Sequence, residues 1–307
     1  MSRSDTISSS TSGFSSSAGS TLAVAICTRD NERTIERTLR SVADLADRII
    51  IVDSGSKDRT LEIGAAFDAH IIHRDWPGMI SQRRFSLEQG RDFTWVLLLD
   101  SDESLEPEAR EALRDTVRKN DPALSGWEIN RKIWFLDGWL HHMYHPEWRL
   151  RLVRPAQARI AGTDPHDRVE VDGRVGRLRG IVRHDSWADV HDLVTRQIRH
   201  ASEQAAAHSR GGDLWQILLS PAAAMFKQLI LKRGILDGRR GLIAAGLTAN
   251  YVMLKHAFAA ERRLPARSGG ATGGTSGSTR ESPKSHRVAS RDTSASTSSS
   301  AGREDPA

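Results

Sequence analysis

Between residues 21 and 120, apolar segments alternate with amphipathic ones, and this order restricts the fold more than any other feature of the chain. The apolar segments are TLAVAIC (21–27), DRIIIVD (47–53), AHIIHRD (69–75) and WVLLLD (95–100). The stretches between them have helical spacing, as in 32–45, where apolar residues recur every three or four positions. Continuously apolar strands that alternate with helices are typical of a mostly parallel sheet covered on both faces. We therefore expect an α/β fold.

The two ends of the chain differ in composition from the middle. Residues 1–20 and 265–307 are rich in Ser, Thr, Gly and Arg and have almost no large apolar side chains. Such segments cannot bury enough apolar surface to offset chain entropy, so we expect two disordered tails. Residues 21–264 are numerous enough for one α/β domain with appended helices.

The cysteine content and the apolar runs suggest a compartment. Cys27 is the only cysteine, which fits a reducing cytoplasm and excludes a disulfide framework. The N-terminus lacks a basic stretch followed by an apolar run, so no secretory signal is expected. No segment reaches the roughly 18 uncharged apolar residues of a spanning helix, and the longest candidate, 241–255, contains Asn250.

Polar clusters follow three of the apolar segments, namely TRDN (28–31), DSGSKD (53–58) and DSDE (100–103). In parallel sheets, ligands bind beyond the carboxyl ends of the strands. Asp100 and Asp102 project the same way from an extended strand end. Mg²⁺ commonly binds through one or two carboxylates together with substrate phosphates, so this pair indicates a divalent cation site. The alternative is a solvated acidic turn that caps the next helix.

The second half of the chain changes character twice. Residues 125–190 are dense in Trp, His and Arg and consist of short strand-like pieces, so we expect an antiparallel extension of the sheet. Residues 191–264 return to helical spacing, with Lys and Arg among Leu, Ile and Ala. This region either packs on the core as an ordinary helical subdomain or lays an apolar face in lipid. Its excess of cations favours the membrane surface.

Several blocks of sequence resemble a known family. TRDNE, IIIVDSGSKDRTLEI, RDWPGMISQRRFSL and WVLLLDSDE are similar to successive blocks of family 2 glycosyltransferases with the GT-A fold. The later blocks WFLDGWLHHMYHPEWRLRLVRP, HDRVEVDGRVGRLRGIVRHDSW and GILDGRRGLIAA resemble the bacterial glucosyltransferase-like proteins of lipopolysaccharide inner-core assembly. The resemblance implies a Rossmann-like GT-A domain over 21–190, with a nucleotide-binding half (21–124) and an acceptor half (125–190). A basic, membrane-associating helical region follows at 191–264.

The resemblance also implies an activity and a donor site. The activity is inverting, metal-dependent transfer of a hexose such as glucose from a nucleotide-diphosphate sugar, expected to be a UDP-sugar, to a lipid-linked glycan. The cofactor is Mg²⁺ or Mn²⁺. The positions matched to donor binding are Thr28, Asp30, Asp53, Gln82, Arg83 and Asp100. The positions matched to the metal are Asp100, Asp102 and the late His184.

The acceptor hydroxyl needs a general base on the opposite face of the sugar. Glu147 is the first candidate, because Pro146–Glu147 stands where the resembling proteins commonly have Pro-Asp. Asp167, in the stretch PHDRVEV, is the second. Further cations expected to face an anionic acceptor are Arg149, Arg151 and His166.

Two other functions fit the sequence. One is a polyprenyl-phosphate glycosyltransferase, whose acceptor is a lipid phosphate. The other is a catalytically inert membrane- or nucleic-acid-binding module. Nucleic acid is not an expected partner, because the C-terminal cations lie among aliphatic side chains rather than among stacking aromatics. We expect a cytoplasmic protein that is peripheral at the inner membrane and has the membrane surface as a partner.

Overall fold

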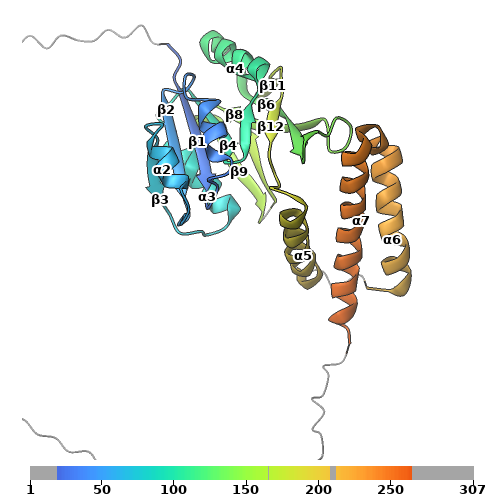
Figure 1. Ribbon diagram of the computed structural model, residues 1–307. Coiled ribbons are helices and arrows are strands. Elements are labelled where there is room, and N and C mark those ends of the chain that lie inside the picture. Colours follow the sequence, from blue (N-terminus) through green and yellow to red (C-terminus); the bar gives the residue numbers. More distant parts are fainter. Residues whose placement is uncertain (1–18, 165, 208–211, 265–307) are drawn as a thin grey trace, which may run out of the picture. The chain divides into compact units, whose positions relative to one another are not determined.

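The computed structural model describes residues 19–164, 166–207 and 212–264, apart from the side chain of His166 (Figure 1). Both predicted tails lie outside the described residues, except for residues 19 and 20. The division of the chain into domains stays a prediction.

The first half of the fold alternates strands and helices, as the sequence predicts. Its elements are β1 (Leu22–Thr28), α1 (Ile35–Arg40), β2 (Arg48–Asp53), α2 (Thr60–Ala65), β3 (His70–His73), α3 (Met79–Gln89) and β4 (Trp95–Asp100). Strand β1 pairs in parallel with β2 and with β4, and β2 pairs in parallel with β3. Helix α1 is shorter than the segment 32–45, but turns with helical hydrogen bonds continue beyond it and bury Val42.

The second half contains shorter elements. They are β5 (Glu103–Leu105), α4 (Pro107–Lys119), β6 (Leu124–Phe135), β7 (Gly138–Trp139), β8 (Glu147–Val153), η1 (Pro155–Gln157), β9 (Ala158–Thr163), β10 (His166–Val171), β11 (Arg174–Arg177) and β12 (Val182–His184). The main sheet has the order β3-β2-β1-β4-β8-β6-β12-β5, with β7 and β11 also pairing with β6. Strands β9 and β10 form a separate antiparallel pair.

The predicted antiparallel extension is only partly right. Strand β8 runs antiparallel to both β4 and β6, as expected. Strands β11 and β12, however, run parallel to β6. The 12 residues of β6 are long enough to pair with several later strands, of which β7 and β8 run antiparallel to it and β11 and β12 parallel. The result is a mixed sheet in which most pairings are parallel.

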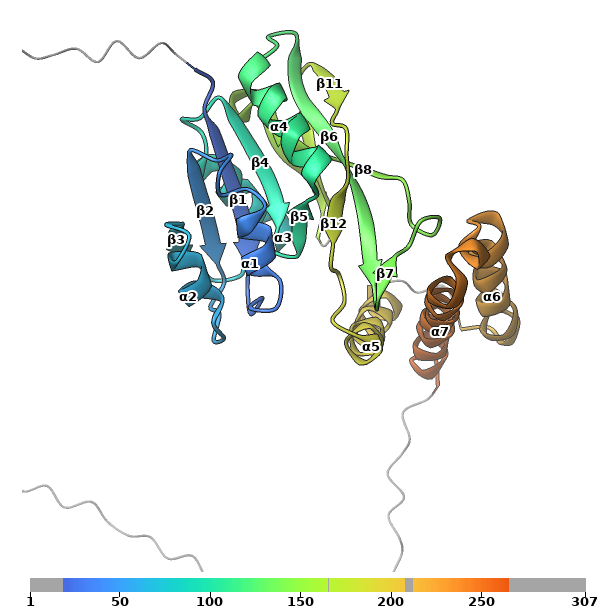
Figure 2. The same cartoon turned by 45° about the horizontal axis from the view of Figure 1, so that its top comes forward.

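Two apolar cores cover the two faces of the sheet, and this explains the continuous apolar runs. Leu22, Val24 and Ile26 of β1 belong to one core, together with residues of α1 and α4. Ala23 and Ala25 belong to the other core, with residues of α3, β9 and β10. Successive strand side chains point to opposite faces, so a strand covered on both sides has no polar alternation. Figure 2 shows α1 and α4 on the same side of the strands.

The C-terminal region is helical. It consists of α5 (Val190–Ala207), α6 (Leu214–Phe226), the π-helical η2 (Lys227–Leu231), η3 (Gly234–Asp237) and α7 (Gly238–Glu261). A third core joins residues of α5 and α7 to residues of β6 and of the β7–β8 segment. Asp237 strengthens this junction, because its carboxylate accepts backbone hydrogen bonds from His141 (2.7 Å) and Met143 (3.0 Å).

Candidate active site

The carboxyl ends of β1, β2 and β4 meet at one edge of the sheet. Thr28 is the Cα partner of Asp53, and Cys27 is the partner of Asp100. The polar clusters that follow these strands therefore converge, as the sequence predicts. This is the edge at which open α/β sheets bind their ligands.

Asp53 and Asp30 shape the loops at this edge. The Asp53 side chain is buried, and its Oδ2 accepts hydrogen bonds from the backbone N–H groups of Gly55 (2.8 Å) and Ser56 (3.0 Å). An Asp that bonds its own backbone two residues on stabilises a turn. Asp30 Oδ1 accepts a hydrogen bond from the backbone N–H of Lys57 at 2.7 Å. Asp53 thus orders the loop after β2, and Asp30 joins the loop after β1 to it.

Helix α3 brings two buried polar side chains to the same edge. Gln82 Nε2 donates to Ser54 Oγ at 3.0 Å. Arg83 Nη2 lies 2.6 Å from Asp100 Oδ1, and Arg83 Nε lies 2.6 Å from Asp167 Oδ2. Burial alone would lower the pKa of Arg83, but the charges of Asp100 and Asp167 outweigh it and raise that pKa. Arg83 therefore links the end of β4 to β10.

Asp100 is surrounded by arginines. In addition to Arg83, Arg151 Nη2 lies 3.4 Å and Arg131 Nη1 lies 3.6 Å from Asp100 Oδ2. Burial opposes ionisation of Asp100, but the charges of Arg83 and Arg151 hold its pKa far below the usual value. Both carboxylate oxygens of Asp100 thus face guanidinium groups.

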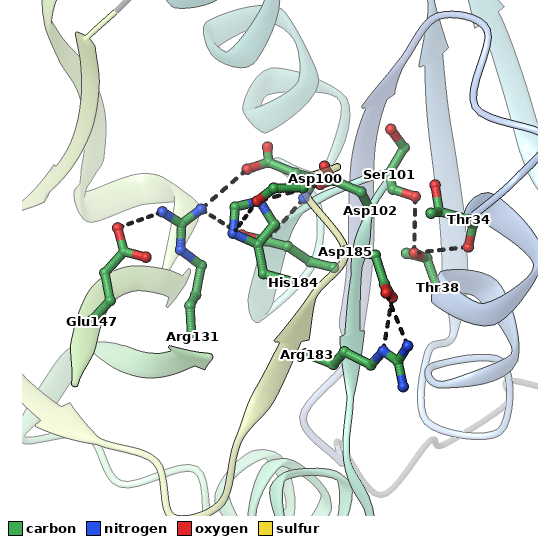
Figure 3. A network of polar contacts seen from close by, with 12 residues as sticks. Thr34, Thr38, Asp100, Ser101, Asp102, Arg131, Glu147, Arg183, His184 and Asp185 are labelled. Atoms are coloured by element: carbon green, nitrogen blue, oxygen red, sulfur yellow. Dashed lines mark hydrogen bonds and ion pairs between the residues drawn. The ribbon is translucent and has the colours of Figure 1, made fainter. Parts of the chain in front are cut away.

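Asp102 faces a histidine instead. Two hydrogen bonds fix the turn that carries Asp102. Thr38 Oγ1 donates to the carbonyl oxygen of Ser101 at 3.0 Å, and the backbone N–H of Asp185 donates to the carbonyl oxygen of Asp102 at 2.9 Å. Asp102 Oδ1 then lies 3.7 Å from Nε2 of His184 (Figure 3). Burial raises the pKa of Asp102, and His184 only partly offsets this effect.

The predicted metal ligands are only partly assembled. Within the described part of the chain, no three His, Cys, Asp or Glu side chains are grouped so that they could hold a metal. Asp102 and His184 come together, but the arginines occupy both oxygens of Asp100. One carboxylate and one imidazole still fit Mg²⁺ or Mn²⁺, because such ions commonly take one or two carboxylates together with substrate phosphates.

Arg131 connects the acid turn to Glu147. Arg131 Nη1 lies 2.8 Å from Oε1 of the fully buried Glu103, and Arg131 Nη2 lies 2.7 Å from Glu147 Oε1 (Figure 3). Arg149 Nη2 also lies 2.7 Å from Glu147 Oε1. Burial favours the neutral form of Glu147, but the hydrogen bond and charge of Arg131 outweigh it and lower the pKa of Glu147.

The sequence model of the family described as "Glycosyl transferase family 2" matches residues 23–183. The chain belongs to glycosyl transferase family 2. The match begins in β1 and ends in β12, next to His184, so it spans the strands and helices that form this site. The loops that follow β1, β2 and β4 all lie within it.

Curated relatives of the chain include two glycosyltransferases of Rickettsia species. An uncharacterized glycosyltransferase of Rickettsia typhi is 30% identical over 191 residues, which cover 59% of this chain and 65% of that protein. One of Rickettsia prowazekii is 29% identical over 191 residues, with the same coverage. The aligned part thus spans slightly less than two thirds of either relative.

Solved structures with a similar arrangement include two other proteins. S. aureus TarS has 16% identity and a TM-score of 0.43, with coverage of 75% of this chain and 90% of that one. Glucosyl-3-phosphoglycerate synthase from Mycobacterium tuberculosis, in complex with Mg²⁺ and UDP, has 23% identity and a TM-score of 0.32. That match covers 37% of this chain and 44% of the other.

The predicted acceptor residues have different surroundings. Arg149 is half-exposed, whereas Arg151 is buried and directed at Asp100, and the role of both towards an acceptor stays a prediction. The side chain of His166 lies outside the described residues. Arg131 is absent from the predicted site residues, although its position in β6 indicates a buried charge. Arg131 occupies the face of β6 on which Ile129 and Ile133 are buried, a position where a lone charge requires a partner.

Proposed function

We propose that the protein is an inverting glycosyltransferase that moves a hexose, such as glucose, from a UDP-sugar to a lipid-linked glycan such as the lipopolysaccharide inner core. The observation that carries this proposal is the convergence of Asp100, Asp102 and three buried arginines at the strand ends of a family 2 chain. Buried guanidinium groups are suited to donate hydrogen bonds to the oxygens of a diphosphate.

The chemistry requires one bond to form and one to break. The acceptor hydroxyl oxygen bonds to the anomeric carbon, the bond from that carbon to the diphosphate oxygen breaks, and the hydroxyl proton passes to a base. We assign the base to Glu147. Its contacts with Arg131 and Arg149 all involve Oε1, so among the described residues Oε2 is left to accept the proton. Its lowered pKa keeps the side chain ionised.

Asp167 is the second candidate for the base. Its Oδ2 lies 2.6 Å from Arg83 Nε, and its side chain is only 11% exposed, against 26% for Glu147. A base must come within hydrogen-bond reach of the hydroxyl, and the more exposed carboxylate is easier for an acceptor to reach. We therefore place Glu147 first.

The leaving diphosphate needs positive charge. Asp102 and His184 would hold Mg²⁺ or Mn²⁺, which when bound offsets charge on the phosphates. Arg151 is suited to help, because its closest carboxylate oxygen is 3.4 Å away and its Nε has no hydrogen-bond partner in the described structure. Burial and the neighbouring Arg83 lower the pKa of Arg151. An incoming phosphate would give Arg151 Nε the hydrogen-bond partner that it lacks among the described residues.

We further propose that the protein works in the cytoplasm, at the inner membrane surface. A lipid-linked acceptor is confined to a membrane, so an enzyme that uses it must reach that surface. The excess of cations in residues 212–264 supports this location, because the cytoplasmic leaflet is anionic.

The direct test is product analysis. The full chain is incubated with membrane extract, Mn²⁺ and a panel of nucleotide sugars, and products are identified by mass. We expect one nucleotide sugar to add a single hexose to a lipid-linked glycan. An acid-labile lipid-phosphate product would instead indicate a polyprenyl-phosphate acceptor, and no product with any donor would favour the inert module.

The site is tested with a matched pair of variants. Asp102→Asn should abolish transfer and leave the thermal melt nearly unchanged, whereas Asp115→Asn, at an exposed position on α4, should keep full activity. Calorimetry with UDP should show that Mn²⁺ strengthens binding to the wild type but not to Asp102→Asn. Full activity of Asp102→Asn would refute the site.

A further inference from the structure

Helix α6 and the π-helical η2 expose an unusual amount of apolar surface. None of the residues Leu214–Leu231 is buried. Their large apolar side chains with at least half of their surface exposed are Leu214 (67%), Trp215 (70%), Leu218 (57%), Leu219 (60%), Phe226 (57%), Ile230 (50%) and Leu231 (68%). Single exposed apolar residues are normal, but a contiguous patch of this kind marks an interaction site. We call this set the α6 face.

The α6 face is on the side of α6 that points away from the other helices. Helix α7 contacts both α5 and α6, and both views show α7 between them (Figures 1 and 2). The inner side of α6 is therefore covered by α7. The α6 face has no such cover among the described residues, as its exposure demonstrates.

The charge of the surrounding residues indicates what covers the α6 face. Residues 212–264 carry eight Lys and Arg but only three Asp and Glu. Two of these three acids are already paired, because Asp213 lies 3.0 Å from Arg263 and Asp237 accepts backbone hydrogen bonds. Exposed cations gather where α6 turns into α7, namely Lys227, Lys232, Arg233 and Arg239. Arg239 lies 3.2 Å from Asp137, but all four of these cations are exposed, and an apolar face bordered by exposed cations is complementary to an anionic lipid surface.

The length of the segment raises the question of whether it spans a membrane. The prediction that 241–255 is the longest apolar candidate is wrong, because η2 extends α6 past Lys227 to Leu231. Leu214–Leu231 has 18 residues with a mean hydropathy of 1.3, enough by length and composition to cross a bilayer. A spanning α6 would, however, carry the partner α7 into the lipid, with Arg239, Arg240 and Lys255. Charges at that depth are costly.

We propose that the α6 face lies in the plane of an anionic membrane and inserts its Leu, Trp and Phe side chains into the headgroup and acyl boundary, while the cations at the α6–α7 turn bind lipid phosphates. The inner side of α6 stays packed on α7. This attachment rests on the proposed membrane location and specifies the surface that provides it, but it does not require sugar transfer and is therefore tested separately from catalysis.

The test is flotation of the full chain with vesicles of phosphatidylcholine that contain phosphatidylglycerol. We expect binding that weakens with salt and is weak on pure phosphatidylcholine vesicles. The variant Leu218→Glu/Leu219→Glu should bind at least about tenfold more weakly, because each leucine contributes about 1.5–3 kcal/mol when buried. The matched control is Ile198→Glu on α5, whose side chain is 45% exposed and which should bind like the wild type.

Other occupants of the face give different results. If the α6 face joined two copies of the chain, the wild type would sediment as a dimer, the double variant as a monomer, and neither would float with vesicles. That result, or an equal loss of binding in Ile198→Glu, would overturn the proposal. Asp102→Asn should float like the wild type, so failure of catalysis and failure of attachment are distinguishable. Circular dichroism checks that each variant is folded.

Discussion

Arg131 holds the buried acids of the site together, and its removal has a calculable effect. Its guanidinium lies 2.8 Å from Glu103, 2.7 Å from Glu147 and 3.6 Å from Asp100. Removing one partner of a buried ion pair costs about 3–5 kcal/mol, because an uncompensated charge stays in the interior. Arg151 Nε, 4.0 Å from Glu103, retains part of the compensation. We therefore expect Arg131→Met to lower the free energy of unfolding by about 3 kcal/mol.

Arg149→Met is a matched control for this variant. Arg149 contacts the same oxygen, Glu147 Oε1, at the same 2.7 Å, but its side chain is 47% exposed, whereas that of Arg131 is 10% exposed. Exposed ion pairs contribute about 0–1 kcal/mol. The pair of variants therefore separates the effect of burial from that of distance. Urea denaturation followed by circular dichroism gives both free energies.

A second mutation checks the cause of the instability. If the unpaired charge of Glu103 is responsible, Glu103→Gln added to Arg131→Met should recover at least about 1 kcal/mol, a coupling typical of contacting residues. Equal and small losses for Arg131→Met and Arg149→Met would refute the reasoning, because they would mean that water reaches the Arg131 cluster in solution.

Three further outcomes are expected. Leu97→Ala, at a fully buried position on β4, should lower the free energy of unfolding by about 2–5 kcal/mol in urea, while Leu242→Ala, at a site 54% exposed, should change it by at most about 0.5 kcal/mol. The lowered pKa of Asp100 means that its ionised form stabilises the fold above the unfolded pKa of about 3.9, and that this contribution is lost as the pH falls through the folded pKa. The stability gap between the wild type and Asp100→Asn should therefore be constant above about pH 4 and narrow below it, and a gap that stays constant at lower pH in urea titrations would contradict the assignment. Glu147→Gln should lower kcat by about 10²- to 10⁴-fold in the sugar-transfer assay, and a larger loss in Asp167→Asn would make Asp167 the base.

The strand-end part of the site could be predicted because its causes are local. An apolar run such as 95–100 identifies a strand covered on both faces, and Asp100 marks the point where that cover ends. The carboxyl ends of neighbouring parallel strands then lie at the same edge of the sheet. The alternation of strands and helices predicts that β1 and β2 are parallel neighbours, and in the structure their last residues, Thr28 and Asp53, are paired.

The partners of the charged side chains could not be predicted, because they depend on contacts between distant segments. The sequence indicates that Arg131 lies on an apolar strand face, but its partner Glu103 becomes a neighbour only through the pairing of β12 with both β5 and β6. Strand β12 is parallel to β6 and antiparallel to β5, and no local sequence pattern specifies this arrangement. For the same reason, the sequence predicts Asp100 as a metal ligand but does not show that the fold surrounds it with guanidinium groups.

The balance of charge at the site bears on how a nucleotide diphosphate could be held there. Four guanidinium groups face four carboxylates, namely Arg83, Arg131, Arg149 and Arg151 against Asp100, Glu103, Glu147 and Asp167. These charges already compensate one another, so a diphosphate would add negative charge without a matching cation. Asp102 stands outside this set, and its pKa is raised because burial disfavours its ionised form and His184 offsets this only partly. A divalent ion between Asp102, His184 and the phosphates would correct both deficits at once, which is why we place the metal at this pair rather than at Asp100.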